Sequence, residues 1–208
     1  MRRNNYQIAR DRAHDLFLAW DQTAMIQRAK LDADDEYLYV RLIDQRCRVD
    51  RATGCVYLPN DEPADYDETL TIYDYLCRAE PIPAEGAWTA LGSLPHTGQT
   101  QPTTKSLFAR EAAFLQTHMD DLPRALSALG GTPFPHGDIA AIVPLVGEMR
   151  VVFQFWAGDD EFPPSATFLW DANAWRKLRM ETMYFAMGCF FRRVRAVIAS
   201  LKIADLDS

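Results

Sequence analysis

The stretch DIAAIVPLVGEMRVVFQFWAGDDEFPPSATFLWD, residues 138–171, decides the fold. It contains three apolar runs, DIAAIVPL, GEMRVVFQFW and ATFLWD, which are separated by short turn-forming segments. Because short connections favour pairing between successive strands, we expect an antiparallel meander of three strands. In VVFQFW every residue except Gln154 is apolar, which is typical of a central strand that is covered on both faces.

The segment AGDDEFPP, residues 157–164, separates the last two apolar runs. We call it the acidic turn. Gly158 and Asp159 suit a change of chain direction, and the two prolines hold the following segment extended. Paired carboxylates could instead supply a general acid and a general base. Turn chemistry is favoured because it explains every residue there except Glu161. We therefore expect Glu161 either to pair with an arginine or to face a pocket.

Length and composition indicate one soluble globular domain. A chain of 208 residues, 48% hydrophobic and 25% charged, can bury a full core, and no apolar run is long enough to span a bilayer. The N-terminal sequence has no apolar segment typical of a signal peptide, so we expect a cytoplasmic protein. The net charge of -7 argues against nucleic acid as a partner, and we expect no membrane partner.

Helical patterns at both ends frame the strands. Apolar residues recur every three or four positions in residues 1–30, and residues 175–203 carry a stripe of methionine, phenylalanine and aliphatic side chains. Residues 36–171 mix strands with helices, one of which follows an acidic run that suits a helix N-terminus. We expect an α+β fold, with an antiparallel sheet packed by long N- and C-terminal helices in a single domain over residues 1–208.

The cysteines argue against a metal cluster and against a disulfide. None of Cys47, Cys55, Cys77 and Cys189 belongs to a C-x-x-C motif, which zinc and iron–sulfur sites commonly use. If RATG forms a hairpin turn, Asp50 pairs with Cys55 and Val49 with Val56. This register places Cys47 and Cys55 on opposite faces of the hairpin, where they cannot bond to each other.

Polar residues at the ends of the predicted strands form a candidate ligand-binding pocket. His136 and Asp138 precede the first strand of the meander, so they should lie near the end of the second strand and its acidic turn. The long irregular loop GSLPHTGQTQPTT adds His96. The candidate residues are His96, His136, Asp138, Trp156, Asp159, Asp160 and Glu161. A histidine with carboxylates could bind a divalent cation, but the spacing assigns no metal ligand, catalytic residue or cofactor.

One long motif and several short ones resemble a known family. The run WAGDDEFPPSATFLWD, residues 156–171, resembles the W-x-G-D-x-E-F-P hallmark of an uncharacterised bacterial and archaeal domain-of-unknown-function family. Shorter pieces agree in the same order along the chain. They are YDYLCRA at residues 73–79, the W-x-x-L at 88–91, LGG at 129–131, G-D at 137–138 and E-T-M at 181–183. The resemblance covers most of the chain from about Ile72 onward.

The resemblance implies a functional setting but no reaction. Members of this family are associated with iron–sulfur cluster domains, in anaerobes with corrinoid methyl-transfer metabolism. It thus implies an accessory or ligand-binding role in redox or C1 metabolism. This chain lacks a cluster-binding cysteine set, so an iron–sulfur or corrinoid-related protein would be a separate partner. The family has no established catalytic residues to carry over.

Three functions follow from these observations. The first is a small-molecule or cofactor-binding accessory protein. The second is a carboxylate- or metal-assisted enzyme that uses His136 and the carboxylates Asp159 to Glu161, and the third is a protein-interaction module. Dinucleotide, P-loop, zinc-protease, serine-hydrolase and EF-hand signatures are all missing from the sequence.

Overall fold

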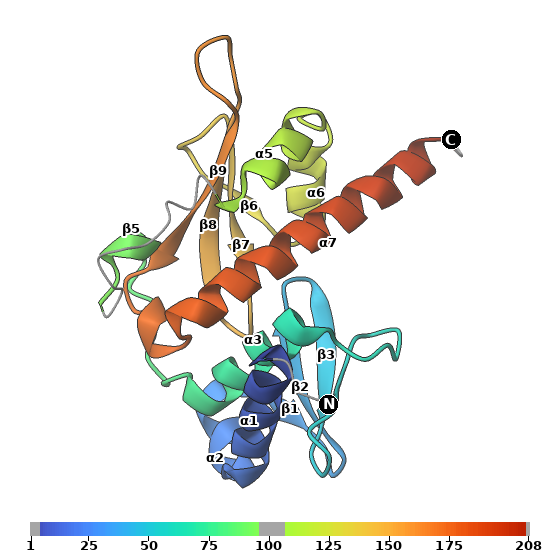
Figure 1. Ribbon diagram of the computed structural model, residues 1–208, viewed down its shortest axis with the longest axis vertical. Helices are drawn as coiled ribbons and strands as arrows, with labels where there is room; N and C mark the ends of the chain where they lie inside the picture. Colours follow the sequence, from blue (N-terminus) through green and yellow to red (C-terminus); the bar gives the residue numbers. More distant parts are fainter. Residues whose placement is uncertain (1–4, 96–106, 207–208) are drawn as a thin grey trace. The chain divides into compact units, whose positions relative to one another are not determined.

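The computed structural model describes residues 5–95 and 107–206 (Figure 1). Their contacts form two compact units, each drawn from segments that lie far apart in the sequence. Unit 1 comprises Met1–Pro83, Leu145–Met149 and Asn173–Cys189, and unit 2 comprises Ala84–Pro144, Arg150–Ala172 and Phe190–Ser208. The α+β class with antiparallel sheets and helices towards both ends is confirmed, and the division of residues 1–208 as one domain stays a prediction.

Unit 1 contains an antiparallel sheet in the order β1-β2-β3-β4. Its strands are β1 (Asp32–Ala33), β2 (Tyr37–Leu42), β3 (Gln45–Asp50) and β4 (Val56–Tyr57). The predicted register is confirmed, because Val49 pairs with Val56 and the N–H of Asp50 donates to the carbonyl of Cys55 (2.8 Å). Cys47 is buried, Cys55 is exposed, and both are free thiols.

The N-terminal helical segment is divided into two helices, α1 (Asn5–Ala19) and α2 (Gln22–Ala29). Asp21 separates them, because its Oδ1 accepts hydrogen bonds from the backbone N–H groups of Thr23 (2.9 Å) and Ala24 (3.2 Å). An N-cap residue has an extended backbone, so α1 cannot continue through it. The apolar spacing that predicts one helix over residues 1–30 runs across this break.

The acidic run before residue 69 begins helix α3 (Tyr66–Arg78). Asp65 caps it: the N–H of Glu68 donates to the Asp65 carboxylate, and the Glu68 carboxylate accepts from the N–H of Asp65 (both 2.9 Å). This capping box satisfies two backbone donors that the helix itself cannot satisfy. The interpretation of the run as a helix start is confirmed.

Unit 1 also includes the connection between two strands of the meander, Leu145–Met149. The N–H of Ile43 donates to the carbonyl of Leu145 (2.7 Å), and the N–H of Gly147 donates to that of Arg41 (2.8 Å). Gly147 has φ +55°, and a Cβ added there would lie 2.2 Å from the Tyr75 ring of α3. Only glycine fits this contact.

Unit 2 contains a five-stranded antiparallel sheet in the order β5-β9-β8-β7-β6. Its strands are β5 (Trp88–Ala90), β6 (Thr132–Pro133), β7 (Ile139–Pro144), β8 (Arg150–Trp156) and β9 (Ser165–Asp171). The predicted meander of three strands is confirmed by the pairing of β7 with β8 and of β8 with β9. β8 is the middle strand, and its residues 151–155 are buried, including Gln154.

Helices complete both units. Unit 2 has the short helices η1 (Leu91–Ser93), α5 (Ala109–Gln116) and α6 (Leu122–Ala128), and Pro123 lies in the first turn of α6. The C-terminal helix α7 (Met180–Leu206) begins after the 3-10 turn η2 (Ala174–Arg176), later than the predicted residue 175. Across residues 5–95 and 107–206, no helix combines the length and apolar character needed to cross a membrane.

The stripe on α7 forms core in both units. In unit 1, Met183 and Met187 are buried. In unit 2, the ring of Phe190 lies 5.1 Å from that of Phe153 on β8 and 5.5 Å from that of Phe168 on β9. Aromatic rings at these separations contribute large buried apolar areas. The methionines therefore pack as ordinary core.

Candidate functional site

The structure brings Asp138 to the acidic turn, as the meander predicts. The N–H of Asp138 donates to the carbonyl of Phe155 (3.0 Å), and its Oδ2 accepts a hydrogen bond from the N–H of Ala157 (2.7 Å). Its neighbour His136 is exposed and packs its ring edge-on against Phe134. Asp138 thus uses a carboxylate oxygen to fix the turn.

Asp159 forms the turn that its sequence predicts. Its Oδ1 accepts hydrogen bonds from the N–H groups of Phe162 (2.7 Å) and Glu161 (2.9 Å). These two backbone donors, Phe162 first, lower the pKa of the Asp159 carboxyl below its ordinary value. A carboxylate with a lowered pKa is poorly suited to act as a general base near neutral pH.

None of the remaining candidate residues lines the pockets of unit 1 described below. Trp156, Asp160 and Glu161 are exposed, and Glu161 forms no ion pair with any residue of 5–95 or 107–206. The expectation that Glu161 pairs with an arginine is therefore wrong, and the alternative that it faces a pocket stays a prediction. His96 lies outside the described residues.

A metal-assisted site lacks a ligand set in the described part of the chain. No group of three or more His, Cys, Asp or Glu side chains there has a geometry that could hold a metal ion. Asp159 and Asp138 instead bind backbone N–H groups of the turn. The geometry at the acidic turn therefore favours a structural role for these two carboxylates.

Unit 1 contains a pocket of about 350 Å³ between α1, α3 and the beginning of α7. We call it the Tyr73 pocket. Its lining comprises Ala9, Arg12, Ala13, Leu16, Tyr66, Leu70, Tyr73, Asp74, Cys77, Arg179, Glu181, Thr182 and Phe185. Most of this surface is apolar or aromatic, with charged groups from all three helical segments.

Aromatic contacts fix the walls of the Tyr73 pocket. The Tyr73 ring stacks on Phe17 of α1 with centroids 5.0 Å apart, and its hydroxyl donates to the carbonyl of Gly54. Tyr66 meets Phe185 edge-on at 5.6 Å. These contacts join α1 to α3 and α3 to α7. The pocket is therefore formed by packed elements of one unit.

One charged group in the pocket, Asp74, is already matched. Its Oδ2 accepts a hydrogen bond from the backbone N–H of Arg179 (2.7 Å), and its Oδ1 lies 3.4 Å from the Nε of the same residue. The Nε of Arg78 lies 3.8 Å from this carboxylate. Asp74 thus holds Arg179 at the pocket edge.

Three other polar groups in the pocket have no such match. Arg12, Glu181 and Thr182 line it, yet none forms a hydrogen bond or ion pair with another residue among those described. Thr182 is only 6% exposed. The buried side-chain atoms that lack a hydrogen bond do not include its hydroxyl, so this oxygen keeps contact with solvent and could bind a ligand in place of water.

Burial moves the pKa values of two pocket groups, Cys77 and Tyr73, further above neutral pH. Cys77 is 2% exposed, and burial, followed by the nearby Asp74 charge, raises the pKa of its thiol to about 11. Burial likewise raises the pKa of the Tyr73 hydroxyl. The pocket therefore offers neither a thiolate nor a phenolate as a nucleophile.

Tyr73 also lines a second pocket of about 360 Å³. We call it the His14 pocket; its lining includes Arg10, His14, Cys55 and Tyr57. The Nε2 of His14 donates to the carbonyl of Thr53 (2.7 Å), so His14 fixes the hairpin turn.

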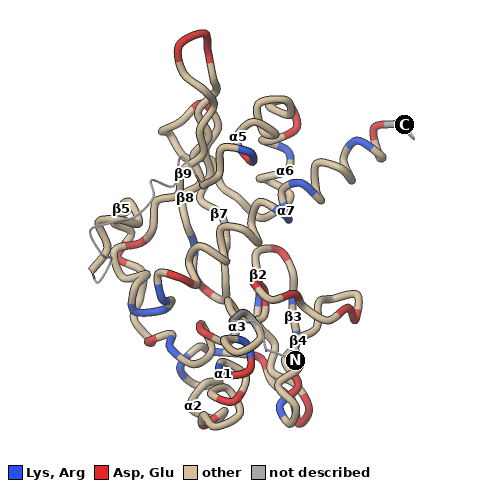
Figure 2. The backbone as a smooth tube through the Cα atoms, viewed as in Figure 1, with Lys and Arg blue, Asp and Glu red and all other residues tan. Residues whose placement is uncertain are grey.

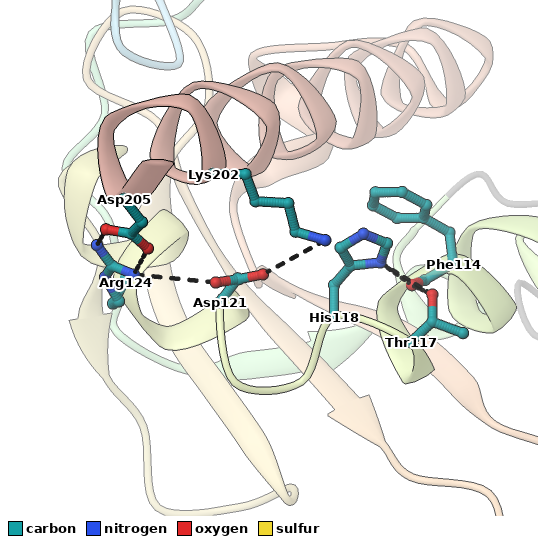
Figure 3. Close-up of polar contacts among 7 residues, drawn as sticks. All are labelled: Phe114, Thr117, His118, Asp121, Arg124, Lys202 and Asp205. Carbon is teal, nitrogen blue, oxygen red and sulfur yellow. Dashed lines mark hydrogen bonds and ion pairs between the residues drawn. The ribbon is translucent and has the colours of Figure 1, made fainter. Parts of the chain in front are cut away.

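Figure 3 shows a charged cluster within unit 2, where α5 and α6 meet the end of α7. Arg124 forms a two-pronged ion pair with Asp205 (2.8 and 3.0 Å), and Lys202 lies 3.9 Å from Asp121. The Nδ1 of His118 donates to the carbonyl of Phe114 (2.9 Å). Each group has an internal partner, so the cluster links helices.

The sequence does not reveal the Tyr73 pocket, because the lining residues are scattered over three helical segments. Two short pieces that carry the family resemblance meet there. YDYLCRA contributes Tyr73, Asp74 and Cys77, and E-T-M contributes Glu181 and Thr182. Neither piece has a recognisable motif spacing. The signal in the sequence is that both belong to the family resemblance, and the structure shows that they meet at one pocket.

Comparison with known proteins places the chain in a family. The searches of curated proteins and of solved structures found no match. Residues 21–193, which include both Tyr73 and the acidic turn, match a family of domains of unknown function. The chain therefore belongs to the family described as Domain of unknown function (DUF3786).

Proposed function

We propose that this protein binds a small organic acid in the Tyr73 pocket. The observation that carries the proposal is that the Arg12 guanidinium and the Thr182 hydroxyl line the same pocket, and neither has a partner among the described residues. Ligand sites combine an apolar lining with a few polar groups that orient the ligand. The Tyr73 pocket has both features.

The charge distribution favours an anionic ligand. Because Asp74 already engages Arg179, the unmatched cation of the pocket is Arg12, whose planar guanidinium suits a carboxylate or phosphate. Glu181 is the corresponding unmatched anion and would repel a second negative group. We therefore expect a ligand with one acid group.

The walls favour a ligand with a compact apolar body. Tyr66, Phe185 and Leu16 supply aromatic and aliphatic surface, and a volume of about 350 Å³ accommodates a molecule of one ring or a short branched chain. With Cys77 and Tyr73 uncharged, binding is favoured over covalent chemistry.

The family resemblance suggests the metabolic context in which this protein would bind its ligand. An accessory role in redox or C1 metabolism, with an iron–sulfur or corrinoid-related protein as partner and a cytoplasmic location, is what the resemblance and composition suggest. A binding protein without its own cluster ligands would serve such a partner by holding a small acid. Co-purification with a cluster-containing protein would support this extension.

The direct test uses defined probes and two matched arginines. Benzoate, phenylpyruvate and phenyl phosphate would be titrated by calorimetry into the wild-type protein, Arg12→Ala and Arg10→Ala. Both arginines are exposed on α1, but Arg10 lines the His14 pocket instead. We expect one site per chain and at least tenfold weaker binding in Arg12→Ala, equivalent to about 1.4 kcal/mol, with Arg10→Ala unchanged.

Native mass spectrometry of the protein purified from its own cells completes the test. We expect a bound mass that is retained in Arg10→Ala and lost in Arg12→Ala. The proposal is wrong if no probe binds and no bound mass is found, or if both variants weaken binding equally. Unfolding curves of the variants would establish that each remains folded.

A further inference from the structure

The acidic turn is built as a fixed protrusion between β8 and β9 of unit 2 (Figure 1). Gln116 accepts a hydrogen bond from the N–H of Gly158 (2.8 Å), and Asp138 accepts one from that of Ala157. A Cβ on Gly158 would lie 2.6 Å from Pro164, so the two ends of the turn pack closely. The Asp159 carboxylate accepts a hydrogen bond from the N–H of Phe162, which closes the middle of the turn.

This fixed turn presents aromatic side chains to solvent. Phe162 is 67% exposed and Trp156, at the end of β8, is 43% exposed. Large exposed aromatic groups are unfavourable in water, and they are the side chains that most often anchor protein–protein contacts. An anchor that is already held in one conformation loses little entropy on binding.

The charged residues of the acidic turn itself all have one sign. Asp159, Asp160 and Glu161 precede Phe162, and residues 157–164 contain no lysine or arginine, as the red tip in Figure 2 shows. Neither Asp160 nor Glu161 forms an ion pair with any of the residues that the structure describes. Free carboxylates beside an apolar anchor match a partner whose apolar pocket is rimmed by basic groups.

We propose that the acidic turn docks Phe162 into an apolar pocket of another protein, and that lysine or arginine side chains around that pocket pair with Asp160 and Glu161. A second copy of this chain is a poor partner, because its own net charge is -7. Residues of unit 2 carry this inference, so it stands independently of ligand binding in unit 1.

Photo-crosslinking in the cells that produce the protein tests the docking directly. A benzoylphenylalanine would replace Phe162 in one variant and Ile203 in a control, because Ile203 is similarly exposed (62%) on α7. We expect a single adduct with another protein at position 162 that is missing at position 203. Adding Asp160→Lys and Glu161→Lys should reduce its yield at least fivefold.

Purified components then separate the apolar and charged contributions. The crosslinked protein would be titrated with wild-type protein and Phe162→Ala, for which we expect at least tenfold weaker binding and a further loss on raising the salt concentration. Phe162 is exposed, so its replacement should leave the unfolding curve unchanged.

Three outcomes would overturn the inference. The first is an adduct at position 162 that is no stronger than at position 203. The second is an adduct whose yield survives the charge reversal or whose partner binds Phe162→Ala normally. The third is an adduct with a second copy of this chain. Ligand binding by Arg12 could persist in all three cases, which keeps the two proposals distinguishable.

Discussion

In unit 1 the Tyr73 pocket leaves Arg12 and Thr182 without partners among the described residues, whereas in unit 2 the acidic turn engages Asp138 and Asp159 in backbone hydrogen bonds. The Tyr73 pocket leaves these polar groups available to a ligand and keeps Tyr66 and Phe185 half-buried. The acidic turn uses its polar groups to hold the backbone and exposes an aromatic ring, Phe162.

The difference shows that carboxylates in a sequence motif do not by themselves mark a reactive site. Polar groups of a pocket that have no protein partner remain available to a ligand, whereas an exposed aromatic side chain leaves water only when a partner covers it. The first arrangement suits a small molecule and the second suits a protein surface.

The largest effect should come from Gly147→Ala, which tests whether unit 1 depends on the inserted connection. The new methyl group would meet the Tyr75 ring at 2.2 Å with φ at +55°. Overpacking together with backbone strain predicts a loss of about 3 kcal/mol in the free energy of unfolding. Chemical denaturation measures this loss.

Gly86→Ala is the matched control for Gly147→Ala. Gly86 has φ +73°, but a Cβ there meets nothing within 4 Å. Gly86→Ala should therefore lose only about 1 kcal/mol of unfolding free energy, from backbone strain alone. Equal losses in the two variants would mean that the contact with Tyr75 is unimportant.

The sequence predicts local pairing well because local pairing follows from alternation and turn chemistry. The register of Val49 with Val56 and the central place of β8 both follow from patterns within a few residues. The insertion of Gly147 against Tyr75 does not, because it joins segments more than 70 residues apart and leaves only an ordinary glycine in the sequence.

The candidate site shows the same limit. The approach of Asp138 to Ala157 follows from strand order and was predictable. The exposure of Glu161 was not, since turn geometry decides where that side chain points. Arg12 and Thr182 line one pocket because their helices pack together. The sequence shows an apolar stripe on each helix but not which helices pack against each other.

A smaller effect should appear in the pH dependence of unit 1. Burial raises the pKa of Cys77 from 9.0 to about 11, so the unfolded chain releases this proton at a lower pH than the folded chain. Stability should therefore be full below pH 9 and should fall as the pH rises from 9 to 11. Allowing for solvent screening, we expect a loss of about 1 kcal/mol.

Cys77→Ser identifies the source of this pH dependence. Serine does not ionise in the range, so the decrease in unfolding free energy between pH 9 and pH 10 should disappear, even if the variant is less stable at every pH. That interval lies below the ordinary tyrosine pKa, which limits interference from Tyr73. An unchanged slope in Cys77→Ser would assign the effect to another group.

The smallest effect should come from the acidic turn, where Asp159→Ala removes the acceptor for two backbone N–H groups. Hydrogen exchange at Glu161 and Phe162 should accelerate several-fold without a change in global unfolding, because the turn lies at the end of the sheet. Asp160→Ala is the matched control: its carboxylate holds no part of the turn, so exchange should stay as in the wild type.

The pH dependence of this turn should have the opposite sign to that of Cys77. Because backbone donors lower the pKa of Asp159, its contribution is present above the ordinary carboxyl pKa and is lost as the pH falls through the lowered value. NMR titration of the Phe162 amide should show that change in the wild type and not in Asp159→Ala. If the turn stays ordered in Asp159→Ala, the contacts of Gln116 and Pro164 are sufficient to hold Phe162 in place. Docking should then persist in Asp159→Ala and be lost in Phe162→Ala.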